Sequence, residues 1–144
     1  MDLDSIQTID AVIEALQIII EEAKTENSPL GYFPALYQKV TIKVKEGIEE
    51  DFFEDGPRME KLDVVFAKRY LEAYDKAQQG RSAAQSWEKA FQLSQEYWPI
   101  VLQHLLMGIN AHINLDLGLA AAEISTPDNI QSLATDFRRI NQVL

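Results

Sequence analysis

Polar side chains that could do chemistry are concentrated in one apolar segment, residues 100–122, in which Asp116 is the one formally charged residue. At about 100° per residue on a helix, His104, His112 and Asp116 spread over roughly a third of the circumference. His112 and Asp116 are one turn apart, so their side chains point the same way. A neutral imidazole and a carboxylate in this relation suit zinc, iron or manganese, as ligand pairs do in helical-bundle metalloproteins.

The same pair has a structural interpretation, in which a buried hydrogen bond between His112 and Asp116 fixes the register of the helix. His-x-x-x-Asp is a short pattern, which favours the structural interpretation over the metal interpretation. Its place in an apolar helix reduces this preference. Three amides form a second stripe roughly opposite to this pair: Gln103, Asn110 and Asn114. We expect these amides to connect helices, because they bond readily with the backbone and with each other.

A second acidic cluster lies between residues 58 and 79. Asp63 falls within the apolar arc of that segment and Glu60 lies at its edge; the arc is made by Met59, Leu62, Phe66, Tyr70, Ala73 and Tyr74. An acid among aromatic residues is paired, protonated or bound to a cation. Arg69 or a tyrosine hydroxyl would be the structural partner of Asp63. The metal interpretation instead joins it to the residues of the apolar segment.

The metal interpretation predicts a mononuclear or dinuclear site for zinc, iron or manganese, with nitrogen and oxygen ligands. Its expected ligands are His104, His112, Asp116 and Asp63. Glu60 would be a further ligand or the general base that acts on a metal-bound water. The prediction requires the two segments to face each other in the fold.

Helices are the elements that would position these side chains. The sequence predicts an all-α single domain, residues 1–144, with about five helices around a buried central helix at residues 100–122. Val40, Ile42 and Val44 alternate with polar residues as in a strand, but a wider window has helical spacing. Because a lone strand would lack a partner, we expect a helix there.

Composition restricts the function further. Thirteen basic and 23 acidic residues give a net charge of −10, which disfavours nucleic acids and anionic membrane surfaces as partners. The absence of cysteine excludes disulfides, thiolate metal sites and cysteine nucleophiles. The acidic N-terminus is unlike a secretory signal, so the expected location is cytoplasmic.

Residues 100–122 are apolar enough to suggest a membrane span, but their histidines, amides and aspartate would be costly in lipid. The last predicted helix follows Pro127 and keeps an apolar stripe through Phe137, Ile140 and Leu144. It therefore predicts an exposed apolar patch that a homodimer would bury.

Four segments resemble an uncharacterised bacterial family, domain-of-unknown-function family 5995: GYFPALY at 31–37, EDGPRMEKLDVVFAKRY at 54–70, SWEKAF at 86–91 and LQHLLMGINAHINLDLGLAAA at 102–122. The resemblance implies the helical fold and the choice of residues, but no activity. Members of that family generally continue past residue 144, so the chain is expected to be a short member or a truncated one. Residues 111–116 are also similar to the His-x-x-x-Asp zinc pair of helical zinc-dependent phospholipase C, whose further histidines this chain lacks.

The leading hypothesis is a metal-dependent hydrolase-like protein that acts on a small-molecule substrate. The alternative is a non-catalytic interaction or scaffold domain whose buried polar residues only specify packing. A third hypothesis is a bundle that binds a small molecule through Tyr70, Tyr74 and Trp87.

Overall fold

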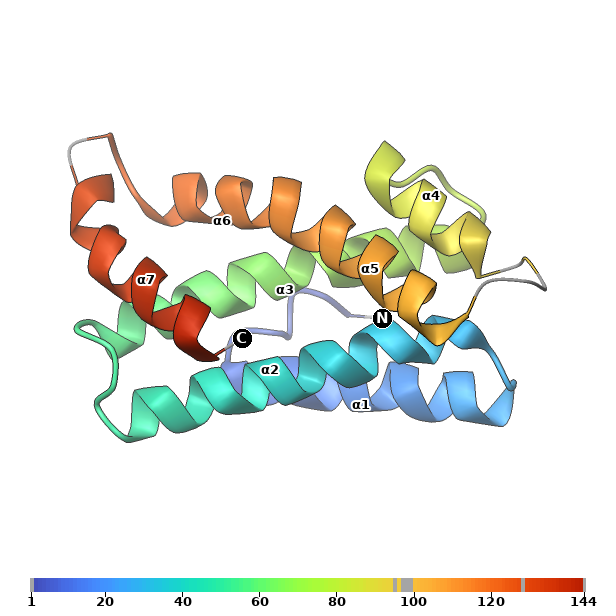
Figure 1. Cartoon of the computed structure of the whole chain (residues 1–144), viewed down its shortest axis with the longest axis horizontal. Coiled ribbons are helices and arrows are strands. Elements are labelled where there is room, and N and C mark those ends of the chain that lie inside the picture. The colour runs from blue at the N-terminus through green and yellow to red at the C-terminus, as the bar shows by residue number, and fades with distance from the viewer. Residues whose placement is uncertain (1, 95, 97–99, 128, 144) are drawn as a thin grey trace.

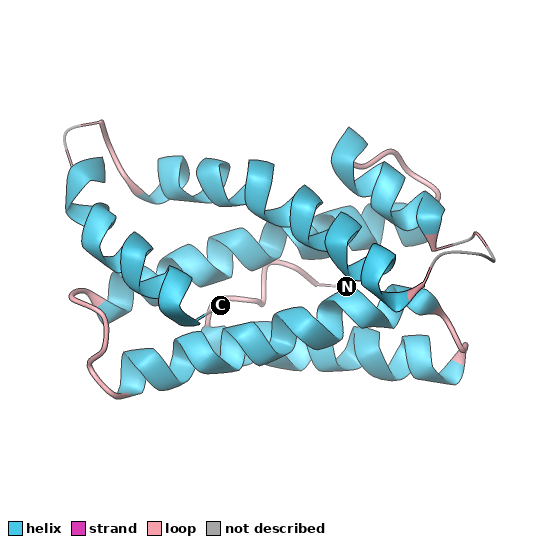
Figure 2. Cartoon of the chain, viewed as in Figure 1, coloured by secondary structure: helices cyan, strands magenta, loops and turns pink. Residues whose placement is uncertain are grey.

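The computed structural model describes residues 2–94, 96, 100–127 and 129–143. In this part of the chain every regular element is helical (Figure 2). The elements are α1 (Ile9–Thr25), a 3-10 turn (Pro29–Gly31), α2 (Tyr32–Glu49), α3 (Gly56–Gln78), α4 (Gln85–Leu93), α5 (Val101–Ala111), the π-helical turn η2 (His112–Asp116), α6 (Leu117–Ile124), the 3-10 turn η3 (Ile130–Leu133) and α7 (Ala134–Val143). The predicted all-α single domain is confirmed.

The helices form a layered bundle. α1 and α2 pack side by side as an antiparallel pair, and α3 contacts both of them (Figure 1). The α5–α6 run covers α2 and α3, with α4 beside α5, while α7 crosses the far end and contacts α2. Since α5, η2 and α6 follow one another without a break, the described residues form six main helices, against about five predicted.

Local sequence explains where α1 and α3 begin. The side chain of Thr8 accepts a hydrogen bond from the amide of Ala11 and caps α1. Asp55 caps α3 in the same way, with Pro57 in the first turn. The ambiguous stretch at residues 40–45 lies inside α2 and is helical, as the wider window indicated.

The α5–α6 run differs from the prediction, because it is an outer layer and not the centre of the bundle. Its inward face is made of small and polar residues: His104, Gly108, Ala111, His112, Asp116, Ala120 and Ala121. Large apolar side chains on the opposite face are exposed: Val101, Leu102, Leu106, Leu115 and Leu119. Small inward residues let the helix lie close to α2 and α3, and Gly108 lies directly against Phe33. The helical run Val101–Ile124 is long and apolar enough to cross a membrane by length and composition alone.

The amides expected to join helices are also exposed. Asn114 donates a hydrogen bond to Asn110 one turn earlier, and the Gln103 side chain accepts from the amide of Ile100 at the start of α5. These contacts lie within the α5–α6 run and connect it to no other helix. The prediction for this stripe was therefore wrong.

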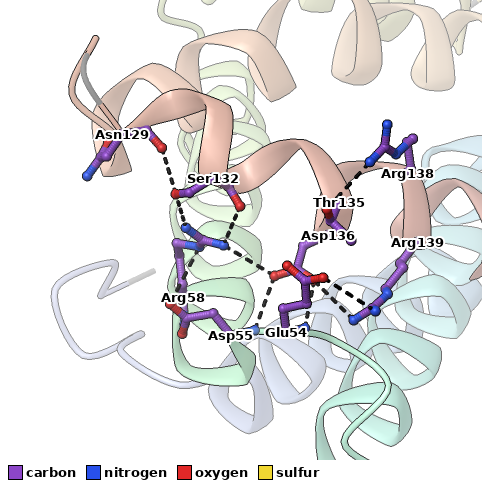
Figure 3. A network of polar contacts seen from close by, with 9 residues as sticks. All are labelled: Glu54, Asp55, Arg58, Asn129, Ser132, Thr135, Asp136, Arg138 and Arg139. Atoms are coloured by element: carbon purple, nitrogen blue, oxygen red, sulfur yellow. Dashed lines mark hydrogen bonds and ion pairs between the residues drawn. The ribbon is translucent and has the colours of Figure 1, made fainter.

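A buried carboxylate fixes α7 to the beginning of α3 (Figure 3). Asp136 is 0% exposed and accepts hydrogen bonds from the backbone amides of Glu54, at 2.7 Å, and Asp55, at 3.2 Å. Arg58 donates at 3.4 Å to the carboxylate oxygen that also accepts from Asp55, and an Arg139 nitrogen lies 3.7 Å from the other oxygen. This network holds α7 across the end of the bundle.

Candidate functional site

A cavity of 230 Å³ lies between α2, α3, the α5–α6 run and α7, and we call it the core cavity. Its wall is mostly apolar and includes Phe66 of α3, Ile109 of α5 and Ile140 of α7. Ile113 both lines it and is 38% exposed, so the cavity reaches the surface beside α2. Three polar residues also line it: Tyr37, Asp63 and His112.

Each of these three side chains has a buried polar atom without a hydrogen-bond partner among the described residues. Tyr37, Asp63 and His112 are each at most 4% exposed. The unpartnered atoms are Tyr37 Oη, Asp63 Oδ2 and both ring nitrogens of His112. Buried polar atoms are normally paired, because an orphan costs roughly 1–3 kcal/mol. This concentration in one cavity therefore marks it as the candidate site.

Aromatic rings hold the His112 imidazole in place. It is stacked on Phe66, with ring centres 3.5 Å apart and planes within 8°, and the Tyr37 ring centre is 4.4 Å away. Its Nδ1 lies 3.6 Å from Asp116 Oδ2, which accepts a hydrogen bond of 2.8 Å from the Trp87 indole. Burial lowers the pKa of His112 to about 4, although Asp116 acts in the opposite direction. The imidazole is neutral at neutral pH.

Burial acts on the two acidic groups of the cavity as well. It raises the pKa of the Asp63 carboxyl to about 7, and the nearby charge of Glu60 adds to the shift. The pKa of Tyr37 is raised well above its usual value, first by burial and then by the charges of Asp63 and Asp116. The cavity thus holds one carboxyl poised between its two protonation states near neutral pH.

The backbone at this site has an unusual form. Residues His112–Asp116 make a π-helical turn within the α5–α6 run. Such single-turn insertions are rare and frequently occur at functional sites. No sequence pattern indicated this turn.

The structure brings together only part of the predicted metal site. Asp63 and His112 line one cavity, and Asp116 lies beside His112 on the same turn. His104 lies two turns away, next to Tyr32, and borders a separate small cavity. Within the described residues, no three His, Asp or Glu side chains are grouped so that they could hold a metal ion. This arrangement gives the metal prediction no support.

Glu60 has a structural contact and does not line the core cavity. Its carboxylate accepts a hydrogen bond of 3.1 Å from the amide of Ile9, at the beginning of α1. Arg69, considered as a partner of Asp63, pairs with Glu123 on the surface. Tyr70 and Trp87 pack against each other and are not among the residues that line the core cavity. The tyrosine that lines it is Tyr37, which no sequence pattern singled out.

Fold and cavity define a class, an all-α single-domain protein with a few buried polar groups in the wall of an otherwise apolar cavity. The chain matches the model of a family of unknown function, DUF5995, over residues 9–144, and it belongs to that family. Comparison with curated proteins and with solved structures gives no significant match. The similarity to phospholipase C therefore depends on residues 111–116 alone.

Proposed function

We propose that the protein binds a small molecule with an apolar body and a polar head in the core cavity. The observation that carries the proposal is the set of unpartnered polar atoms on Tyr37, Asp63 and His112, in a cavity that is otherwise apolar. Ligand sites commonly have this composition, with a few polar groups that orient a largely apolar ligand.

The size of the cavity limits the ligand. A protein cavity of about 150 Å³ can hold benzene. On the same scale, the 230 Å³ of the core cavity suit a molecule of roughly nine non-hydrogen atoms. 2-Phenylethanol has this size and carries a neutral polar head, so it is a suitable first probe.

Calorimetric titration of the protein with 2-phenylethanol, and with alcohols of increasing size, tests the proposal. The variant Val40→Phe places a larger side chain in the wall of the cavity and should reduce binding about tenfold or more. Ile42→Phe is the matched control, since Ile42 lies on the same helix, is exposed and does not line the cavity. Equal binding by the two variants, or no binding by the parent protein, would contradict the proposal.

The metal-dependent hydrolase expected from the sequence is the competing interpretation. It requires a metal ion held by His112 and Asp116 together with Asp63, and a water molecule activated by that ion. Elemental analysis of protein purified without chelator separates the two interpretations. A stoichiometric divalent ion that is lost in Asp116→Asn would favour the hydrolase. Binding of 2-phenylethanol in the core cavity would contradict the scaffold alternative.

A further inference from the structure

The polar atoms of the core cavity can all accept hydrogen bonds. Asp63 Oδ2 is a carboxyl oxygen, and a neutral imidazole such as that of His112 presents one ring nitrogen as an acceptor. The hydroxyl oxygen of Tyr37 accepts as well. Each of the three polar residues that line the cavity thus carries one buried acceptor.

The charges around these atoms are negative. No lysine or arginine is among the described residues that line the core cavity. Glu60 on α3 and Asp116 on η2 place further negative charge near Asp63 and Tyr37. The whole chain carries a net charge of −10. An anionic head is therefore disfavoured here, whereas a cation would serve as the counter-ion of Asp63.

Aromatic rings add to the preference for a cation. Phe33, Tyr37 and Phe66 all line the core cavity. The face of an aromatic ring attracts a cation within about 6 Å, and the attraction increases when both groups are removed from water.

We propose that the polar head of the ligand is a primary ammonium group, bound by Asp63, His112 and Tyr37, and that a small apolar body fills the rest of the core cavity. An ammonium group has three donors, which match the three acceptors. This inference rests on the proposed function and specifies its class of ligand as a small hydrophobic amine.

Three probes of similar size and different charge test the inference: 2-phenylethylamine, 2-phenylethanol and phenylacetate. Each is titrated calorimetrically into the full chain at pH 8, above the pKa of about 7 of the Asp63 carboxyl. At this pH the amine is protonated, as a lysine side chain is. We expect the amine to bind at least about tenfold more tightly than the alcohol, because a buried hydrogen bond between charged groups is worth about 1.5–3 kcal/mol. Phenylacetate should bind more weakly than both.

Two variants connect this preference to the site. Asp63→Asn should lower the affinity for the amine about tenfold and leave that for the alcohol within about threefold. Tyr37→Phe should lower the affinity for the amine about fivefold, and it tests the site independently of Asp63. Glu72→Gln is the control, because it removes a negative charge from the same helix but Glu72 is exposed and does not line the cavity; it should leave both affinities unchanged.

The outcomes distinguish this inference from the proposed function. If the alcohol binds as tightly as the amine and Asp63→Asn changes neither affinity, the cavity binds small molecules but not through an ammonium group. If none of the three probes binds, the proposed function fails together with the inference.

Discussion

Asp63 and His112 lie in one apolar environment, and it shifts their protonation in opposite directions. Folding raises the pKa of Asp63 from 3.8 to about 7 and lowers that of His112 from 6.5 to about 4. Between about pH 4 and 6.5, the unfolded chain therefore carries a proton on His112 and the folded chain carries one on Asp63. The His112 contribution makes stability increase with pH in this range, and the Asp63 contribution makes it decrease. The two contributions largely cancel.

Removal of the Asp63 carboxyl should change how the free energy of unfolding depends on pH. In the parent protein, the stability that comes from protonated Asp63 is present in full below about pH 4 and is lost as pH increases through 7. Asp63→Asn does not undergo this loss. Relative to the parent, its free energy of unfolding should therefore increase between pH 4.5 and 8 by about 3 kcal/mol. Urea unfolding at the two pH values measures the difference.

Glu72→Gln is the control for this experiment, because Glu72 lies on the same helix but is exposed. Its free energy of unfolding should differ from that of the parent by the same amount at both pH values. A difference between Asp63→Asn and the parent that does not change with pH would show that the Asp63 carboxyl is ionised throughout.

Asp136 is the second buried acid with a structural consequence, and the sequence contained a signal for it. It lies between Leu133 and Ile140 at three- and four-residue spacing, on the inward stripe of its helix. The rule that singled out Asp63, an acid within an apolar arc, would have found Asp136 too. Its partners were not predictable, because they are backbone amides at residues 54 and 55 that only the fold brings close.

Asp136→Ala should destabilise the protein strongly. The change leaves two backbone amides and the Arg58 guanidinium without their acceptor, and removing one partner of a buried ion pair costs about 3–5 kcal/mol. Thermal or urea unfolding measures the loss. Glu123→Ala removes the partner of Arg69 in a pair that is partly exposed, so it should cost less than about 1 kcal/mol. Similar losses in the two variants would contradict the structural role of Asp136.

At the scale of the elements, helical periodicity predicted α2 and α3 well because their apolar side chains face the core. It misplaced the α5–α6 run for a physical reason. Both faces of that run are apolar in composition, one with glycine and alanine and the other with leucine and isoleucine. When both faces of a helix are apolar, a periodic pattern does not show which face lies inward. Close packing on α2 and α3 selects the face with the small residues. The π-helical turn at His112–Asp116 left no signal in the spacing.

Two glycines of this run give a direct test of the close packing. A Cβ atom on Gly108 would lie 2.4 Å from the Phe33 ring, whereas no atom lies within 4 Å of the corresponding position on Gly118. Gly108→Ala should therefore destabilise the protein by about 2 kcal/mol, since the overpacking exceeds the gain in helix propensity. Gly118→Ala should stabilise it by about 0.5–1 kcal/mol. Unfolding curves of both variants are compared with the parent, and a gain in both would show that α5 does not pack closely on α2.

At the scale of the whole molecule, the exposed side of the α5–α6 run continues toward the C-terminal helix. A further cavity, of 400 Å³, lies beside η3 and α7 and is lined by Ala121, Ile130, Leu133, Ala134, Phe137 and Arg138. Of the stripe predicted to be exposed, Ile140 is buried at 9% and Phe137 is half-buried, while Leu144 lies outside the described residues. The apolar surface is therefore made mainly by Ile130 and the leucines of the α5–α6 run.

This surface is the basis for the last prediction, a homodimer formed through η3, α7 and the neighbouring part of α6. A membrane is the less favourable partner, because the other face of the run packs on α2 and α3 and buries His112 and Asp116, which would be costly in lipid. A second copy would bury the apolar side chains without exposing that face, and symmetric dimers are the commonest assemblies.

Sedimentation equilibrium should therefore show a dimer of the parent protein. Ile130→Lys places a charge on the predicted interface and should shift the equilibrium to the monomer. Ile18→Lys is the matched control: Ile18 is 53% exposed on α1, away from this surface, and its substitution should leave the dimer intact. A monomeric parent protein, or a dimer that tolerates Ile130→Lys, would contradict the prediction.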